Sequence, residues 1–594
     1  MLRSKPALLL AAALAGLGCS PGESPGGGTL GRSRNPETYV HAAISDIDTL
    51  DPTWAYDSTS QNIHINLYET LVGYKGSSVT ELEPLVAEQV PTAENGLLSK
   101  DGRRYEFPIR KGVRFHHGGE ATPEDVRYSL IRFMLLDREG GPSSILLEPV
   151  AGIPSTRDRE GRIREEAYDK VSRAVRVEGD RVVLLLNKPF PPMLTALASW
   201  APVLSKSWCV ANGEWDGGKA DWKKRNNPAR ASTYLHEHAN GTGPFMLDTW
   251  DHGKKEIVLA RFDGYWRGPA RIKRAVFRAV EEPQTRKLML AAGDADSISA
   301  DLMHLPLLEK IPGVQILSDL SGIDMASAVF FVFRIDAKGN PYVGSGSLDG
   351  EGIPPDFFSD LHVRKAFAYA FDYDGYTRDV NRGMGSRARS FIPKGLFGYD
   401  PKQTVYEYDL KKAEAHFRKA LGGRVWQKGF RFTIAYNEGR QAHQVIATML
   451  KRSVGEINPK FRIDMKQLDW SAYLDQANRS RLPMFVLRWS PDYPDPYNFA
   501  FPFMHSQGFY PRLQRYRSAE ADGLVTKLMS ETAPAKRLSL VRRLQAIAHE
   551  DVPTLFIADS VGLRVQRTWV RGFTHNPVFP TSPNMCPLYY LSKS

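Results

Sequence analysis

The chain has 594 residues and 42% hydrophobic content, so it can bury a large core, and its length predicts two or three folded units. Lysines and arginines, which give a formal net charge of +11, alternate with Asp and Glu along most of the chain, and the densest basic run is Lys223-Lys224-Arg225. This pattern excludes the clustered positive surface that nucleic-acid binding needs.

The first residues have the pattern of an export signal. Arg3 and Lys5 precede an Ala/Leu run over residues 7–17, which has the length of a signal-peptide core and is too short to span a bilayer stably. The small residues before Cys19 resemble a bacterial lipoprotein signal, which implies a signal peptide over residues 1–19 and a lipid on Cys19. Because Leu17 stands one place later than in the usual pattern, cleavage elsewhere remains an alternative.

Residues 20–36 are rich in Gly, Ser and Pro and predict a flexible tether between this anchor and a folded body. Three cysteines, none in CxxC spacing, exclude a disulfide framework, a zinc ribbon and a redox pair. In an exported protein, Cys209 and Cys586 are either a disulfide or two separate buried thiols, and the sequence leaves both open.

The first elements after the tether are a strand within 37–47, a helix over 60–71 and a hairpin around the Asp-Gly turn of 100–110. A well-marked helix begins at Thr122, which can cap the first turn, while Pro123 suits the first helical position. The acidic residues that follow Pro123 complement the amide end of this helix.

The second half of the chain alternates helices and strands. A helix begins at Asp360, and its apolar residues recur at intervals of three, four, seven and eight, which gives it one apolar face. Further helices are expected over 408–417 and 441–450, and strands over 430–436 and 461–465. This alternation predicts an α/β lobe.

The most informative stretch is 485–496, where an apolar strand runs into a turn with three prolines. Proline restricts the backbone, so Trp489, Asp492 and Tyr493 would be held at a strand end with little freedom left to lose on binding. An aromatic face beside a fixed carboxylate suits a ligand with an apolar part and a positive charge, such as a peptide amino terminus. A structural turn whose acids cap backbone amides is the alternative.

Several separate motifs follow one another along nearly the whole chain after the tether. They are Asp46-x-x-Thr-Leu-Asp-Pro, Asn66-Leu-Tyr-Glu-Thr-Leu-Val, Thr122-x-Glu-Asp-Val-x-Tyr-Ser, Gly241-Thr-Gly-Pro-Phe, Val363-Arg-Lys-Ala-Phe-Ala-Tyr-Ala-Phe-Asp and Trp489-Ser-Pro-Asp-Tyr-Pro-Asp-Pro. Together they resemble family 5 extracellular solute-binding proteins, which are the dipeptide- and oligopeptide-binding components of ABC importers. Arg488 departs from this pattern, because a glycine usually precedes the tryptophan.

The resemblance implies an α/β fold of the periplasmic-binding-protein kind (type II, cluster C-like), with two lobes and an additional domain inserted in the first lobe. The implied division is lobe I over 37–62, 236–325 and 555–594, the inserted domain over 63–235, and lobe II over 326–554. The chain is expected to cross between lobes near 318–333 and 553–565.

The resemblance also implies roles for residues of the turn. Asp492 corresponds to the carboxylate that binds the α-ammonium of a peptide, and Trp489 to an aromatic residue that lines the cleft. Tyr493 and Arg488 complete the expected ligand site. A ligand carboxylate would be received by Arg488 or by the pair Arg387 and Arg389, with solvation at the surface as the alternative for these arginines.

The implied function is that of a monomeric, membrane-anchored lipoprotein in the periplasm or at the cell surface. It would capture peptides by hinge closure and deliver them to the permease subunits of an ABC importer, without a cofactor. Within binding proteins, the alternative is a non-peptide solute such as a nickel chelate or haem. From another class, the alternative is an exported hydrolase or a sensor.

Fragments of catalytic motifs do not support an enzyme. The phosphate-loop spacing of 213–219 lacks the hydroxyl that should follow its lysine, because residue 220 is alanine. His116-His117 and His236-Glu237-His238 do not form an HExxH zinc motif, so solvent-facing histidines are the simpler interpretation and a metal or haem role is the alternative. We therefore expect no catalytic residues and no metal site.

Overall fold

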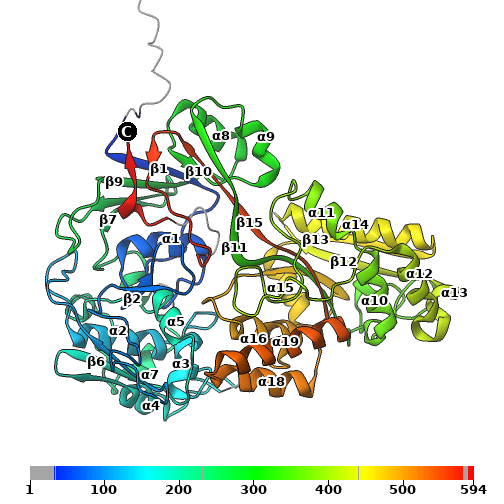
Figure 1. Cartoon of the computed structure of the whole chain (residues 1–594), viewed down its shortest axis with the longest axis horizontal. Helices are drawn as coiled ribbons and strands as arrows, with labels where there is room; N and C mark the ends of the chain where they lie inside the picture. Colours follow the sequence, from blue (N-terminus) through cyan, green and yellow to red (C-terminus); the bar gives the residue numbers. More distant parts are fainter. Residues whose placement is uncertain (1–32, 34, 159, 230–231, 439, 580–585) are drawn as a thin grey trace, which may run out of the picture.

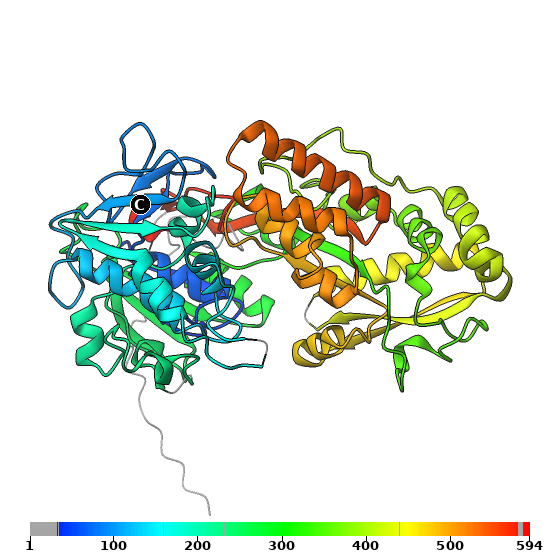
Figure 2. The same cartoon turned by 90° about the horizontal axis from the view of Figure 1, so that it is seen from below.

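The computed structural model describes residues 33, 35–158, 160–229, 232–438, 440–579 and 586–594. The expected signal peptide, Cys19 and most of the expected tether lie outside the described residues. Two bodies lie side by side in both views, one built mainly from the first half of the chain and one mainly from the second (Figures 1 and 2). Within the described ranges, no helix has the length and apolar character needed to cross a membrane.

One mixed sheet runs through both bodies, and within the described residues it has ten strands in the order β13-β12-β14-β11-β15-β10-β1-β9-β8-β7. Its strands are β1 Thr38–Ala43, β7 Phe245–Asp251, β8 Glu256–Arg261, β9 Arg274–Ala279, β10 Ser297–Ile298, β11 Val314–Phe331, β12 Phe430–Asn437, β13 Phe461–Leu468, β14 Met484–Trp489 and β15 Thr554–Arg567. The two longest, β11 and β15, pair antiparallel and connect the two bodies (Figure 1). The α/β fold class predicted from the sequence is confirmed.

The first body adds two small antiparallel sheets, β2-β3 and β4-β6-β5, and most of the helices that cover them. Its remaining elements are α1 Ser58–Leu67, β2 Val72–Tyr74, β3 Leu82–Pro84, β4 Arg104–Pro108, α2 Pro123–Leu135, α3 Ser144–Ala151, α4 Ala167–Ala174, β5 Val175–Glu178, β6 Arg181–Leu185, α5 Met193–Ser199, α6 Lys206–Ala211, α7 Trp222–Arg225, α8 Pro283–Ala292 and α9 Leu305–Leu308. The C-terminal strands β16 Val570–Arg571 and β17 Ser592–Lys593 return to this body (Figure 1).

The second body packs helices on β12, β13 and β14. These helices are α10 Leu361–Ala370, α11 Tyr373–Asp379, α12 Leu410–Lys419, α13 Arg424–Lys428, α14 Gln441–Ile457, α15 Trp470–Asn478, α16 Tyr497–Met504, α17 Phe509–Gln514, α18 Ala519–Ser530 and α19 Pro534–Asp551. As the apolar spacing predicts, Phe367 of α10 points into the core, where its ring lies 6.1 Å from those of Phe430 and Phe432 on β12.

The observed helix ends differ from the expected ones for local reasons. The helix expected over 60–71 ends at Leu67, because Tyr68 has extended backbone and the amide of Gly243 donates to the carbonyl of Leu67 at 3.0 Å. A Cβ at Gly241 would lie 2.0 Å from the same carbonyl oxygen, so glycine is needed for this close approach. The helix expected over 408–417 begins at Leu410 because Asp409 caps it.

The expected domain division stays a prediction. Its boundary between residues 62 and 63 falls inside α1, and its crossings fall in the region of β11 and β15. Cys209 and Cys586 are both buried and both free, so the structure does not form the disulfide that the sequence left open.

The predicted cap at Thr122 is confirmed. Its hydroxyl accepts from the amide of Asp125 at 3.3 Å, and the carboxylate of Asp125 accepts from the amide of Thr122 at 3.0 Å, which completes a capping box.

Thr122→Ala is expected to lower the free energy of unfolding by about 1 kcal/mol, because the amide of Asp125 at the start of α2 loses its acceptor, the hydroxyl of Thr122. Urea denaturation of the two proteins measures the difference. Thr80→Ala, at an exposed loop threonine, is the control. An equal shift in both variants would mean that the cap does not contribute.

Candidate functional site

A cavity of about 440 Å³ lies where α1, the segment 198–202 and the C-terminal segments 572–579 and 587–590 meet the turn that follows β14. Aromatic rings form much of its wall, including those of Tyr68, Trp200, Tyr265, Tyr589 and Tyr590. The second body contributes Pro491 and Asp492 to this wall. The cavity therefore lies between the two bodies, where closure would enclose a small solute.

Asp492, the central residue of the sequence prediction, is held by neutral donors. The hydroxyl of Tyr56 donates to one carboxylate oxygen at 2.7 Å, and the side-chain amide of Asn498 donates to the other at 3.0 Å. The indole of Trp200 donates to the backbone carbonyl of Asp492 at 2.8 Å. Burial raises the pKa of this carboxyl above its usual value, although both donors oppose the shift. Among the described residues, no cationic side chain pairs with it.

Asp492 also lines a second cavity, of about 240 Å³. Trp489 and Tyr493 line this smaller cavity together with Tyr56 and Phe190 of the first body. Trp489 is fixed by a hydrogen bond from its indole to the carbonyl of Asn498 at 3.0 Å, and Tyr493 by edge-to-face packing on Phe190. The structure thus brings three of the four predicted ligand residues to the two cavities, and Asp492 is shared by both.

Arg488, the fourth, is not among the described residues that line either cavity. Its guanidinium contacts the carboxylate of Asp324 on β11 at 3.2 Å and the hydroxyl of Ser490 at 2.7 Å. The ion pair with Asp324 balances the charge of Arg488 and links β14 to β11. A ligand carboxylate would have to compete with Asp324 for Arg488.

Arg387 and Arg389, the other expected carboxylate receptors, do not join Asp492. Arg387 pairs with Glu407 at 2.9 Å and lies over the ring of Tyr373, and Arg389 donates to the carbonyl of Gln403 at 3.1 Å. They line a separate small cavity in the second body. The segment after α11 packs against β15 at this point, and a role for these two arginines in receiving a ligand carboxylate stays a prediction.

Glu69 is a buried carboxylate at the wall of the larger cavity that the sequence did not single out for binding. It accepts from the hydroxyls of Tyr265 at 2.8 Å and Thr242 at 3.0 Å, and from the indole of Trp266 at 3.1 Å. Burial raises its pKa to about 7. These contacts give the aromatic pair after β8 two roles. Tyr265 lines the cavity, and the ring of Trp266 contacts the guanidinium groups of Arg110 and Arg267, at 4.4 and 4.8 Å from the ring centroid.

The histidine motifs have structural contacts. His116 is buried between the carbonyl of Gly243 at 3.0 Å and the amide of Gly241 at 3.2 Å, and His117 stacks on Trp208. His238 stacks on Tyr234 at 3.8 Å between ring centroids. Within the described ranges, no group of three or more His, Cys, Asp or Glu side chains is arranged to hold a metal ion.

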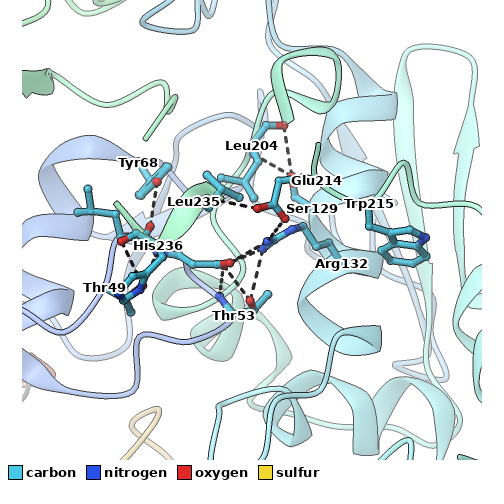
Figure 3. A network of polar contacts seen from close by, with 12 residues as sticks. Thr49, Thr53, Tyr68, Ser129, Arg132, Leu204, Glu214, Trp215, Leu235 and His236 are labelled. Atoms are coloured by element: carbon cyan, nitrogen blue, oxygen red, sulfur yellow. Dashed lines mark hydrogen bonds and ion pairs between the residues drawn. The ribbon is translucent and has the colours of Figure 1, made fainter. Parts of the chain in front are cut away.

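The loop that carries Tyr56 is fixed by a buried ion-pair network (Figure 3). Arg132 of α2 donates to both carboxylate oxygens of Asp51 at 2.7 Å and to Glu214 at 2.8 Å. Asp51 also accepts from the amide and hydroxyl of Thr53. The network joins three distant segments and holds the start of the loop that leads to Tyr56.

The sequence motifs did not indicate four residues of the site, which are Tyr56, Trp200, Phe190 and Glu69. Tyr56 lies 436 residues from Asp492 along the chain, and Trp200 lies 292 residues from it. No local pattern marks either residue. Glu69 stands inside one of the quoted motifs, and the available signal was a charged residue in a short stretch bounded by Leu67 and Leu71.

Comparisons with known proteins agree with this architecture. The family model described as bacterial extracellular solute-binding proteins, family 5 (middle), matches residues 81–511. Heme-binding protein A of Haemophilus influenzae is 25% identical over 565 residues, which cover 92% of this chain and 92% of that protein. The dipeptide-binding protein of Escherichia coli is 25% identical over 574 residues, covering 93% and 94% respectively.

Among solved structures, the ABC transporter-associated periplasmic binding protein DppA from Helicobacter pylori, in complex with peptide STSA, matches with a TM-score of 0.70 and 22% identity. The match covers 94% of this chain and 98% of that one. This likeness confirms the predicted two-lobed binding-protein fold. Since the family model spans most of the sequence, the chain belongs to the bacterial extracellular solute-binding proteins, family 5.

Proposed function

We propose that this protein is an extracytoplasmic receptor that captures peptides between its two lobes by hinge closure and delivers them to the permease of an ABC importer. The observation that carries the proposal is the carboxylate of Asp492, which neutral donors hold at the wall shared by two cavities. A peptide α-ammonium at this position would supply the missing positive charge. In a closed cleft such a contact stabilises the complex by about 1.5 to 3 kcal/mol.

The connection between the lobes supports a hinge mechanism. The long strands β11 and β15 are the elements that pass between the two bodies, and Tyr56 and Trp200 reach across to the Asp492 turn. Closure around a ligand needs a small number of flexible connections and contacts that can form on both sides of a cleft. A lipid on Cys19, the tether over 20–36 and a monomeric receptor complete the proposal.

The test starts with native mass spectrometry of the protein purified from its own cells, before and after denaturation, to identify whatever is released. Calorimetry then compares binding of that ligand to the wild type and to Asp492→Asn. We expect a mixture of short peptides and a loss of about 1 to 3 kcal/mol in the variant, because asparagine keeps the shape but not the charge. Asp374→Asn, at an exposed aspartate, is the control.

A non-peptide solute is the second candidate. The aromatic wall of the larger cavity, which also includes His64, favours a planar apolar ligand, and one relative of comparable similarity is named for haem binding. Release of a single non-peptide species would contradict the peptide proposal and favour this one. A peptide that binds Asp492→Asn as well as the wild type would contradict the role of Asp492 as the receptor of the α-ammonium.

A further inference from the structure

The smaller cavity beside Asp492 has walls from both bodies and a mixed character. Helix α3 contributes Ser144, Ile145, Glu148 and Pro149, and the segment after β14 contributes most of the rest. Aromatic rings dominate the lining, including those of Phe190, Trp489, Tyr497 and Phe509. Its volume of about 240 Å³ exceeds several-fold the roughly 30 Å³ that one water occupies in the liquid, so a long side chain fits.

Glu148 is the unexplained group of this cavity. Its side chain is mostly buried, and its carboxylate forms no hydrogen bond or ion pair with another described residue. Burial raises its pKa, and its charge acts on the hydroxyl of Tyr497, which lines the same cavity. A carboxylate in such surroundings is costly unless a cation joins it.

The other charges around the cavity leave it negative. Asp492 lines it and has neutral partners, whereas Asp495, on the same turn, is already paired with Arg537 at 2.6 Å. Arg512 lines the cavity from an exposed position on α17. Two carboxylates therefore face one solvated guanidinium, among aromatic faces that attract cations.

We propose that this cavity binds the side chain of the ligand's first residue and selects a basic one. The α-ammonium would contact Asp492, and the terminal ammonium or guanidinium of a lysine or arginine side chain would contact Glu148. This inference rests on the proposed peptide binding and narrows it to peptides with a basic amino-terminal residue. A neutral side chain of similar length leaves Glu148 without a cation, and an acidic one adds repulsion.

Calorimetry with the tripeptides Lys-Ala-Ala, Met-Ala-Ala and Glu-Ala-Ala tests the inference on the full-length protein. The wild type should bind the lysine peptide about 10-fold or more tightly than the methionine peptide, the usual effect of one charge-assisted contact. Glu148→Gln should remove this ratio, because neither peptide then meets a carboxylate at this position. Glu139→Gln, at an exposed glutamate on the loop before α3, should keep the ratio.

A second measurement needs no variant, because it removes the charge from the ligand. Nε-acetylation of the lysine peptide should weaken its binding to the wild type by the same factor as replacing lysine with methionine. Equal binding of lysine and methionine peptides by the wild type, or a ratio that Glu148→Gln preserves, would overturn the inference and leave peptide binding intact. Failure of all three tripeptides to bind would overturn both the inference and the proposed function.

Discussion

Arg132→Met is expected to lower the free energy of unfolding by about 3 to 5 kcal/mol, because it leaves two buried carboxylates without their cation. The side chain of Arg132 and that of Asp51 are fully buried, and that of Glu214 is 5% exposed. Methionine has a similar length and fills the space, so the loss reports the missing charge rather than a cavity. Urea or thermal unfolding of the purified protein measures the effect.

Two further variants separate burial from charge. Arg162→Met removes an ion pair with Asp158 at 2.7 Å, but Arg162 is 75% exposed, so the expected loss is below about 1 kcal/mol. The triple variant Arg132→Met, Asp51→Asn, Glu214→Gln removes all three charges and should recover part of the stability. Similar losses in the two single variants would show that the buried network contributes no more than a surface pair.

Asp559→Asn is expected to stabilise the protein at pH 8 and to flatten the pH dependence of its stability between pH 4 and pH 7. Asp559 lies on β15 opposite Met325 of β11, where it is 3% exposed. One carboxylate oxygen accepts from the amide of Lys394 at 3.1 Å and the hydroxyl of Ser386 at 3.2 Å, and the other has no hydrogen-bond partner among the described residues. Burial, with the neighbouring Asp324, raises its pKa from 3.8 to about 7.

The direction of the effect follows from which state binds the proton more tightly. Because the pKa of Asp559 is higher in the folded state than in the unfolded chain, the proton stabilises the fold at low pH, and this stabilisation is lost as pH rises from 3.8 to about 7. Above that range, the wild type buries an unpaired charge that the asparagine variant lacks. The difference at pH 8 should reach about 2 to 4 kcal/mol.

Unfolding at pH 5 and pH 8 measures this prediction, with Asp356→Asn, at an exposed aspartate, as the control. Glu69, whose pKa burial also raises to about 7, contributes in the same direction in both proteins, so a smaller slope should remain in Asp559→Asn. If the variant is no more stable than the wild type at pH 8, the carboxylate of Asp559 is solvated or paired in solution.

Local features were predictable because their causes lie within a few residues of one another. The capping box needs Thr122 and Asp125 alone, the apolar face of α10 follows from the spacing of Val363, Ala366 and Phe367, and the proline-rich turn places Trp489 and Asp492 at the end of β14. The series of motifs along the chain predicted the family and the two-lobed fold, and the comparisons confirm both. These conclusions needed no contact between distant segments.

The partners of the site residues were not predictable, since tertiary packing alone decides them. Nothing near Asp492 in the sequence indicates that Tyr56 would donate to it, and nothing near Arg488 indicates that Asp324 would neutralise it. From the sequence, Arg387 is a candidate receptor for a ligand carboxylate. In the fold it pairs with Glu407 and lies over an aromatic ring. Charge and hydrogen-bonding capacity are properties of a residue, but whether they are satisfied depends on what the fold places beside it.

The sequence therefore determined the α/β class, the family and the turn that carries Asp492, because propensity, capping and apolar spacing act over short distances. Only the tertiary structure decided that Asp492 is shared by two cavities, that Glu148 faces the smaller one without a cation, and that Arg132 is buried among carboxylates. The physical reason is that burial raises the free-energy cost of leaving a charge unpaired. Segments that lie hundreds of residues apart in the sequence together produce that burial.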